Sequence, residues 1–181
     1  MNDVEKKYLT KIMKTVPANG IVVEVGSYVG VSSQCIGNGI AKYCPSAKFY
    51  CIDTFKGSTF MDGCNGRARN EMVEMYAKND VKAIFEKNME KYPHQTLVMT
   101  SLDACKKFDD LSIDFIFIDA DHSYDAVKAD INAWLPKIKL GGLMTGHDYS
   151  ETKTDVKKAV DEMFGNKAKL DARSIWRIVK N

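Results

Sequence analysis

Six polar residues with side chains that bind ligands or move protons stand where apolar stretches of this chain end. They are Glu24, Asp53, Ser101, Asp119, His147 and Asp148. The apolar stretches look like buried strands, and such a strand gains nothing from ending in a carboxylate unless something nearby needs it. A strand end facing water tolerates any polar residue, which explains a single acid well enough. Six such ends together favour one shared ligand site.

A cluster of acids and histidines lies near the later strand ends. It contains Asp119, Asp121 and His122, followed downstream by His147 and Asp148. Brought together, these carboxylates would repel one another without a cation. The cluster therefore predicts a divalent metal ion.

The first strand end carries an acid followed by two glycines four positions apart, Glu24, Gly26 and Gly30. Glycines let the backbone turn sharply and approach a ligand, and the helix that follows offers free N–H groups. A nicotinamide-binding turn reads G-x-G-x-x-G and cradles a pyrophosphate. Here the middle glycine is missing, and Glu24 would repel phosphate. A carboxylate at this place suits a cationic amine, which points to S-adenosylmethionine, a ligand with an ammonium, a sulfonium and no phosphate.

Two further strand ends have the chemistry of nucleoside binding. Asp53 ends the next strand, where an acid commonly accepts hydrogen bonds from both ribose hydroxyls. Nicotinamide-binding folds share this acid, so Asp53 alone does not decide the cofactor. Ser101 follows the third strand and has the chemistry to contact an adenine edge, although an ordinary turn explains residues 101–103 equally well.

The elements that must position these residues follow from apolar periodicity. The pattern predicts strands at 21–25, 49–53, 96–99, 113–119, 143–146 and 174–179, and helices at 4–16, 31–43, 81–92, 127–138 and 156–164. Alternating strands and helices give a parallel sheet with right-handed crossovers, and two close strands near residues 168–179 predict an antiparallel hairpin at one edge. The expected fold is α/β. Ligands bind beyond the carboxyl ends of such strands, which would bring the six residues together.

Composition limits the classes of partner. The chain has 181 residues, 45% of them hydrophobic and 28% charged, and is expected to form a single domain, residues 1–181. A net charge of +2 gives no reason to expect nucleic-acid or membrane binding. No stretch predicts a membrane span or a signal peptide. The five cysteines contain no C-x-x-C pair, which favours reduced thiols in a cytoplasmic protein.

Residues 54–79 are loop-like and predict a flap or a substrate-facing insertion.

Two blocks carry a family resemblance, Phe117–Tyr124 and Gly141–Tyr149. With them the chain resembles the class I S-adenosylmethionine-dependent methyltransferases. More narrowly, it is similar to the small metal-dependent O-methyltransferase branch that includes the sugar, catechol and caffeoyl-CoA types. The resemblance runs from Glu24 to the final strand and implies a single-domain, Rossmann-like methyltransferase sandwich with a mostly parallel seven-stranded sheet and an antiparallel C-terminal hairpin.

The resemblance implies roles for individual residues. Asp119 matches the first metal-binding aspartate of the branch, His147 and Asp148 match a later metal-binding pair, and His122 matches the general base. Many relatives have two acids, or an acid and an amide, at the later pair. Imidazole suits Mn²⁺, Fe²⁺ or Zn²⁺ better than Mg²⁺, so His147 leaves the choice between magnesium and manganese open. Together, the residues and the resemblance give a cofactor-binding set of Glu24, Gly26, Ser27, Gly30, Asp53, Ser101 and Asp119.

The function expected from the sequence is metal-assisted methyl transfer to an oxygen of a small molecule, such as a sugar, with Asp119 and His122 as the catalytic residues. Three alternatives remain: metal-independent transfer to nitrogen or carbon, an inactive relative that binds the cofactor or no ligand and acts as a partner module, and a nicotinamide dehydrogenase. The acceptor is not readable from the chain. A homo-oligomer is one way to complete the site of so short a member.

Overall fold

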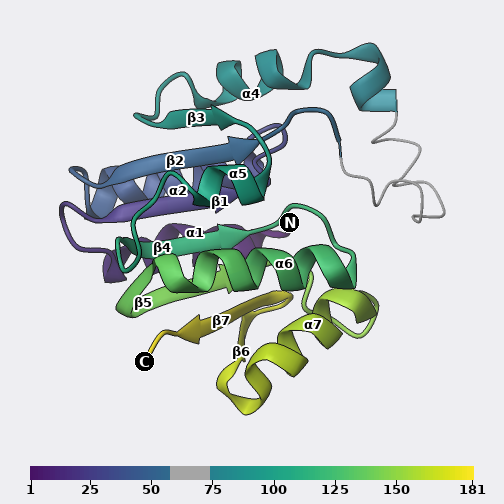
Figure 1. Cartoon of the computed structure of the whole chain (residues 1–181). Coiled ribbons are helices and arrows are strands. Elements are labelled where there is room, and N and C mark those ends of the chain that lie inside the picture. The colour runs from purple at the N-terminus through teal and green to yellow at the C-terminus, as the bar shows by residue number, and fades with distance from the viewer. Residues whose placement is uncertain (58–73) are drawn as a thin grey trace.

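A computed structural model describes residues 1–57 and 74–181, which form one sheet with helices on both faces (Figure 1). The strands are β1 (Ile21–Val25), β2 (Lys48–Asp53), β3 (Gln95–Val98), β4 (Ile113–Ile118), β5 (Ile138–Gly146), β6 (Lys169–Ala172) and β7 (Ile175–Val179). They form a seven-stranded sheet in the order β3-β2-β1-β4-β5-β7-β6. All neighbours pair in parallel except that β7 runs antiparallel to both β5 and β6. The predicted α/β fold, with its C-terminal hairpin, is confirmed.

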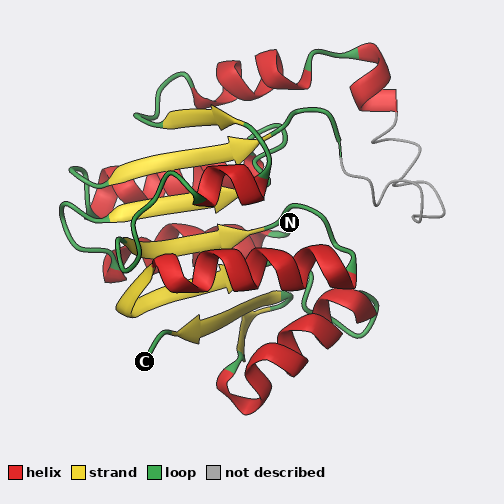
Figure 2. Ribbon diagram, viewed as in Figure 1, coloured by secondary structure: helices red, strands yellow, loops and turns green. Residues whose placement is uncertain are grey.

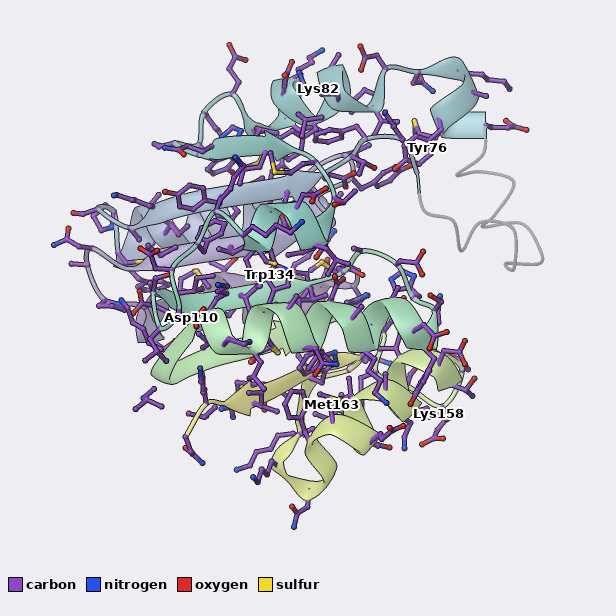
Figure 3. All side chains as sticks on the ribbon, in the orientation of Figure 1. Tyr76, Lys82, Asp110, Trp134, Lys158 and Met163 are labelled. Carbon is purple, nitrogen blue, oxygen red and sulfur yellow. The ribbon has the colours of Figure 1, made fainter. Side chains whose placement is uncertain are left out.

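Helices cover both faces of this sheet (Figure 2). They are α1 (Asp3–Ile12), α2 (Val31–Tyr43), α4 (Val81–Met89), α5 (Ser101–Cys105), α6 (Tyr124–Trp134) and α7 (Thr154–Phe164), with single 3₁₀ turns η1 (Met13–Thr15), η3 (Leu135–Lys137) and η4 (Gly165–Lys167). The core of one face joins the sheet to α1, α2 and α4, and that of the other joins it to α5, α6 and α7. Trp134 lies fully buried between α6 and the sheet (Figure 3).

Burial on both faces explains why the central strands are apolar throughout. In β4, Phe115 and Phe117 point into the core under α1 and α2, whereas Ile116 and Ile118 point into the core under α6 and α7. Side chains alternate along a strand, so a strand covered on both sides needs apolar residues at every position.

The order of the strands reverses between β1 and β4, and the site lies at this point. The chain leaves β1 through α2 on one face and leaves β4 through α6 on the other. The two connections therefore diverge beyond the carboxyl ends of neighbouring strands, which is where sheets of this class bind ligands.

The elements α6, β5 and α5 differ most from the prediction. The apolar stripe predicted a helix as far as residue 138, but α6 ends at Trp134, one η3 turn containing Pro136 follows, and Ile138 already begins β5. Proline lacks the N–H that would continue the helix. The turn that was one of two interpretations of residues 101–103 is instead the start of the short helix α5, whose cap Thr100 accepts a hydrogen bond from the Asp103 N–H at 3.2 Å.

Part of the predicted flap at residues 54–79 lies outside the described residues, namely 58–73. Cys64 lies there too, whereas Cys35, Cys44, Cys51 and Cys105 are free thiols. Among the helices of residues 1–57 and 74–181, none has the length and apolar character needed to cross a membrane.

Candidate active site

A cavity of about 680 Å³ opens at the carboxyl ends of β1, β2 and β4. Its walls come from the bend after β1, the end of β2, the segment leading into α5, and the start of α6. Six residues predicted from the sequence line it: Gly26, Ser27, Asp53, Ser101, Asp119 and His122. Glu24, Gly30, His147 and Asp148 are not among the lining residues.

The bend after β1 requires glycine because of its conformation and its close packing. Gly26 has φ +91°, and a Cβ there would lie 2.2 Å from the backbone oxygen of Asp119. The Gly26 N–H donates to the carbonyl of Ile52 at 2.8 Å. Gly30, at φ +89°, is the N-cap of α2. The bend is therefore pressed between the ends of β2 and β4 and forms the floor of the cavity.

Glu24 is fully buried beneath this bend instead of standing in the cavity wall. Its Oε2 accepts hydrogen bonds from Ser33 Oγ and, at 2.9 Å, from Ser27 Oγ. Its Oε1 has no hydrogen-bond partner among the described residues. The geometry does not support the direct contact with an ammonium group expected from the sequence, because the nearby serines hold the carboxylate below the bend. We therefore expect Glu24 to support the bend.

Burial raises the pKa of Glu24 to about 7, although the hydroxyl groups of Ser32, Ser33 and Ser27 oppose the shift. The folded protein thus holds this proton more tightly than the unfolded chain, whose glutamate pKa is near 4.5. Ionised Glu24 lowers the free energy of unfolding progressively between these two pH values, and the full cost is present above pH 7. A shift of this size corresponds to about 3 kcal/mol.

We expect Glu24→Gln to remove this penalty. The free energy of unfolding of the variant, relative to the original protein, should rise by about 3 kcal/mol between pH 4 and pH 8, measured by urea unfolding without ligands. The matched control is Glu90→Gln, at an exposed position after α4, which should show no such trend. Parallel pH curves for Glu24→Gln and the original protein would contradict the burial argument.

Asp53 is held in place by two backbone N–H groups. Its Oδ2 accepts from Tyr28 N at 2.8 Å and its Oδ1 from Phe55 N at 2.7 Å. Each oxygen has a second lone pair. The carboxylate is therefore fixed at the cavity wall with acceptor capacity left for a ligand's hydroxyl groups.

Asp130 is a site residue that sequence reasoning missed. It lies on α6, is 5% exposed and lines the cavity. Ser101 Oγ donates to Asp130 Oδ1 at 2.5 Å and accepts from Trp134 Nε1 at 2.9 Å. Burial raises the pKa of Asp130 to about 6. A signal was present, since position 130 falls on the buried stripe of α6 with Val127 and Trp134, where an acid is unexpected.

The acids and histidines of the predicted cluster do meet. Asp119, His122 and Asp148 each offer a ligand atom, and these atoms lie within 4.8 Å of one another. His122 Nε2 is 3.1 Å from Asp119 Oδ1 and 3.3 Å from Asp148 Oδ2. Burial disfavours the charged imidazole, but Asp119 and Asp148 outweigh it and raise the pKa of His122. Asp121 accepts a hydrogen bond from the Ser123 N–H at 2.8 Å, at the start of α6.

His147 lies on the other side of the same acids. Its Nδ1 is 3.3 Å from Asp148 Oδ1 and 3.7 Å from Asp119 Oδ2, while its Nε2 faces away from them toward Glu5. Burial opposes the charge on His147, yet Asp148, Asp119 and Glu5 raise its pKa to about 9. In turn, His147, His122 and Lys153 hold the pKa of Asp148 well below its usual range despite burial. The structure thus gathers a compact group of carboxylates and imidazoles beside the cavity.

Comparisons with known proteins identify relatives of this chain. A family model described as a methyltransferase domain matches residues 23–149. A curated relative, y4gI of Sinorhizobium fredii, is 24% identical over 128 residues, which span 70% of this chain but only 13% of that protein. Among solved structures, the O-methyltransferase NovP superposes with a TM-score of 0.69 at 17% identity, over 98% of this chain and 79% of NovP. An O-methyltransferase from Bacillus cereus, solved with S-adenosylhomocysteine, gives a TM-score of 0.62 at 16% identity, over 99% and 82%. These two likenesses concern the fold.

Proposed function

The chain belongs to the methyltransferase domain family, and we propose that it is an S-adenosylmethionine-dependent methyltransferase whose acceptor is a hydroxyl oxygen of a small molecule, activated with the help of a divalent metal ion. One observation carries the proposal: the ligand atoms of Asp119, His122 and Asp148 lie within 4.8 Å of one another at the edge of the cofactor-sized cavity. A cluster of this kind suits an acceptor that must lose a proton.

The cavity has the features that S-adenosylmethionine requires. Its volume of about 680 Å³ is in the ordinary range for small-molecule sites. We assign the methionine portion to the bend at Gly26 and Ser27, the ribose hydroxyls to Asp53, and the adenine to the wall formed by Ser101 and Asp130. Asp53 would accept from the hydroxyls with the lone pairs that its backbone partners leave.

We assign the metal ion to Asp119, His147 and Asp148. Carboxylate oxygens and an imidazole nitrogen are ligands that Mn²⁺ accepts readily, whereas Mg²⁺ prefers oxygen alone, so we favour manganese. When bound, the ion would lower the pKa of the acceptor hydroxyl. The three side chains come from the ends of the neighbouring strands β4 and β5, a rigid frame that fixes their positions.

We assign the general base to His122. It lines the cavity, and its Nε2 is 3.1 Å from Asp119 Oδ1. The base must be neutral to take the hydroxyl proton, and the two acids that raise its pKa are the proposed metal ligands. A cation held by those acids would offset their charge and favour the neutral imidazole. Methyl transfer requires the acceptor oxygen to lie in line with the sulfonium methyl group with water excluded, and the cavity walls would have to hold it there.

A second assignment exchanges the two histidines. Since a ring nitrogen of His122 lies within 4.8 Å of ligand oxygens of both Asp119 and Asp148, His122 is an alternative ligand, with His147 as a supporting residue. The nature of the acceptor, a homo-oligomer and a cytoplasmic location stay predictions. Transfer to nitrogen or carbon without metal, and an inactive partner module, are the rival functions.

The test combines binding and turnover. We expect isothermal titration to detect S-adenosylhomocysteine and Mn²⁺ binding, and a panel of sugars and catechols to include an acceptor whose methylation stops with EDTA and resumes with Mn²⁺. Turnover insensitive to chelation would support the metal-independent alternative. Failure to bind S-adenosylhomocysteine would support the partner module.

Paired variants separate the two histidines. We expect His122→Gln to keep Mn²⁺ affinity and lower kcat by at least about 100-fold, as loss of a general base does. We expect His147→Gln to weaken Mn²⁺ binding. The opposite pattern would assign the ligand role to His122.

A further inference from the structure

Glu5 is a buried acid at the start of α1, far in sequence from the residues discussed so far. Its side chain is shielded from solvent, and the whole residue is 3% exposed. One oxygen has an ordinary role: Oε2 accepts a hydrogen bond from the Asn2 N–H at 2.8 Å, as the glutamate of a capping box does. A capping box does not require the glutamate to be buried, and it does not use the second carboxylate oxygen, Oε1. The environment of Oε1 therefore calls for its own explanation.

Oε1 of Glu5 lies where α1, the β6–β7 turn and the end of β5 meet. It accepts from Ser174 Oγ at 2.7 Å and from Ser174 N at 3.3 Å, and it is 3.3 Å from His147 Nε2. Ser174 Oγ is itself 3.2 Å from His147 Nε2. A carboxylate on α1 thus contacts the histidine that stands beside Asp119 and Asp148.

The hydrogen-bond directions show that Nε2 of His147 carries a proton. Ser174 has a single hydroxyl proton, and Glu5 Oε1 accepts it. Both groups near His147 Nε2 therefore present lone pairs, so Nε2 must be the donor. This leaves the opposite nitrogen, Nδ1, facing Asp148 Oδ1 at 3.3 Å and Asp119 Oδ2 at 3.7 Å.

We propose that Glu5 is a positioning residue of the active site, which holds the proton of His147 on Nε2 and directs the Nδ1 lone pair toward the metal position between Asp119 and Asp148. The inference rests on the proposed metal site and adds a residue to it. Ligating histidines commonly donate their other N–H to a carboxylate, and loss of that partner costs about 10–100-fold in metal affinity. A metal ion binds the neutral imidazole, which has one ring proton; without Glu5, the Ser174 hydroxyl becomes free to donate to Nε2, and that proton then belongs on Nδ1, the nitrogen that would hold the metal.

The test compares four variants by Mn²⁺ titration. We expect Glu5→Ala to weaken Mn²⁺ binding about 10–100-fold, and Glu5→Gln, whose amide oxygen can still accept, to recover most of the affinity. Asn2→Ala removes the α1 cap but leaves the contact with His147, and Ser174→Ala leaves Glu5 as acceptor. Both should bind Mn²⁺ within a few-fold of the original protein. Glu5→Ala binding as tightly as the original protein, or Asn2→Ala losing as much as Glu5→Ala, would overturn the proposal.

A second measurement needs no metal. In ¹⁵N-labelled, metal-free protein, the His147 Nε2–H should give a proton resonance protected from solvent exchange. It should vanish in Glu5→Ala and persist in Asn2→Ala. If the original protein binds no Mn²⁺ but shows this pattern, the metal proposal fails while the positioning role of Glu5 stands. Absence of the resonance from the original protein would overturn the role of Glu5 itself.

Discussion

Replacing Gly26 with alanine is expected to abolish measurable binding of S-adenosylhomocysteine. The positive φ of +91° costs an alanine about 1–2 kcal/mol by itself. The larger effect is steric, because the added Cβ would lie 2.2 Å from the Asp119 carbonyl oxygen and 2.5 Å from its carbon. Both are backbone atoms at the end of a central strand and have no rotamer by which to move aside. The bend must shift, and the cavity floor shifts with it.

Isothermal titration together with thermal unfolding measures this effect, and Gly141→Ala is the matched control. Gly141 also has a positive φ, +79°, but a Cβ there meets nothing within 4 Å. The control should therefore carry only the conformational cost, with cofactor affinity unchanged. If Gly26→Ala bound normally, or if both variants lost binding equally, the close packing of the bend on β4 would not be what the site requires.

Asp119→Asn is expected to lower kcat/KM by about 1,000-fold or more while leaving a folded protein. The carboxylate lines the cavity, contacts His122 at 3.1 Å and faces His147 at 3.7 Å, so one substitution removes charge from both the proposed metal site and the proposed base. General-base catalysis alone contributes about 100- to 10,000-fold, and weakened metal binding adds to the loss. Asparagine keeps the size of the side chain, so the change is mainly electrostatic.

Three measurements check this second prediction: turnover of the acceptor found by screening, Mn²⁺ affinity, and unfolding temperature. The control is Asp125→Asn, which removes an exposed acid from the first turn of α6, the helix that follows Asp119 along the chain. It should behave like the original protein. Normal turnover by Asp119→Asn would remove this residue from the catalytic group and point to metal-independent chemistry.

Local patterns were sufficient to predict most of the fold. The predicted bounds of β1 and α2 match the structure, because an apolar stretch and an apolar helical face are each bounded by glycine. The start of β5 was wrong for a physical reason. Ile138 continues the spacing of Trp134 on α6, so periodicity alone cannot separate a helix end from a strand that starts beyond Pro136.

The candidate site, like the fold, was predictable only where local patterns and strand order determine it. The meeting of Asp119 and Asp148 was predictable because parallel strands bring their carboxyl ends to one edge. The burial of Glu24 was not, since it depends on how Ser27 and Ser33 turn back after the bend. Glu5 was out of reach altogether, because its contact with Ser174 joins positions 169 residues apart, and no local pattern encodes such a pairing.

Because β7 runs antiparallel to β5, the turn between β6 and β7 lies beside the candidate active site. Because β7 runs against β5, Trp176 pairs with Gly146, and the turn at Arg173 and Ser174 arrives beside the last residues of β5. Besides the two strands, hydrogen bonds at Ser174 anchor this turn: its hydroxyl and N–H donate to Glu5, and its carbonyl accepts from the Tyr149 N–H at 2.9 Å. A change in the hairpin turn therefore reaches the surroundings of His147 through Ser174, without any substitution in the five parallel strands.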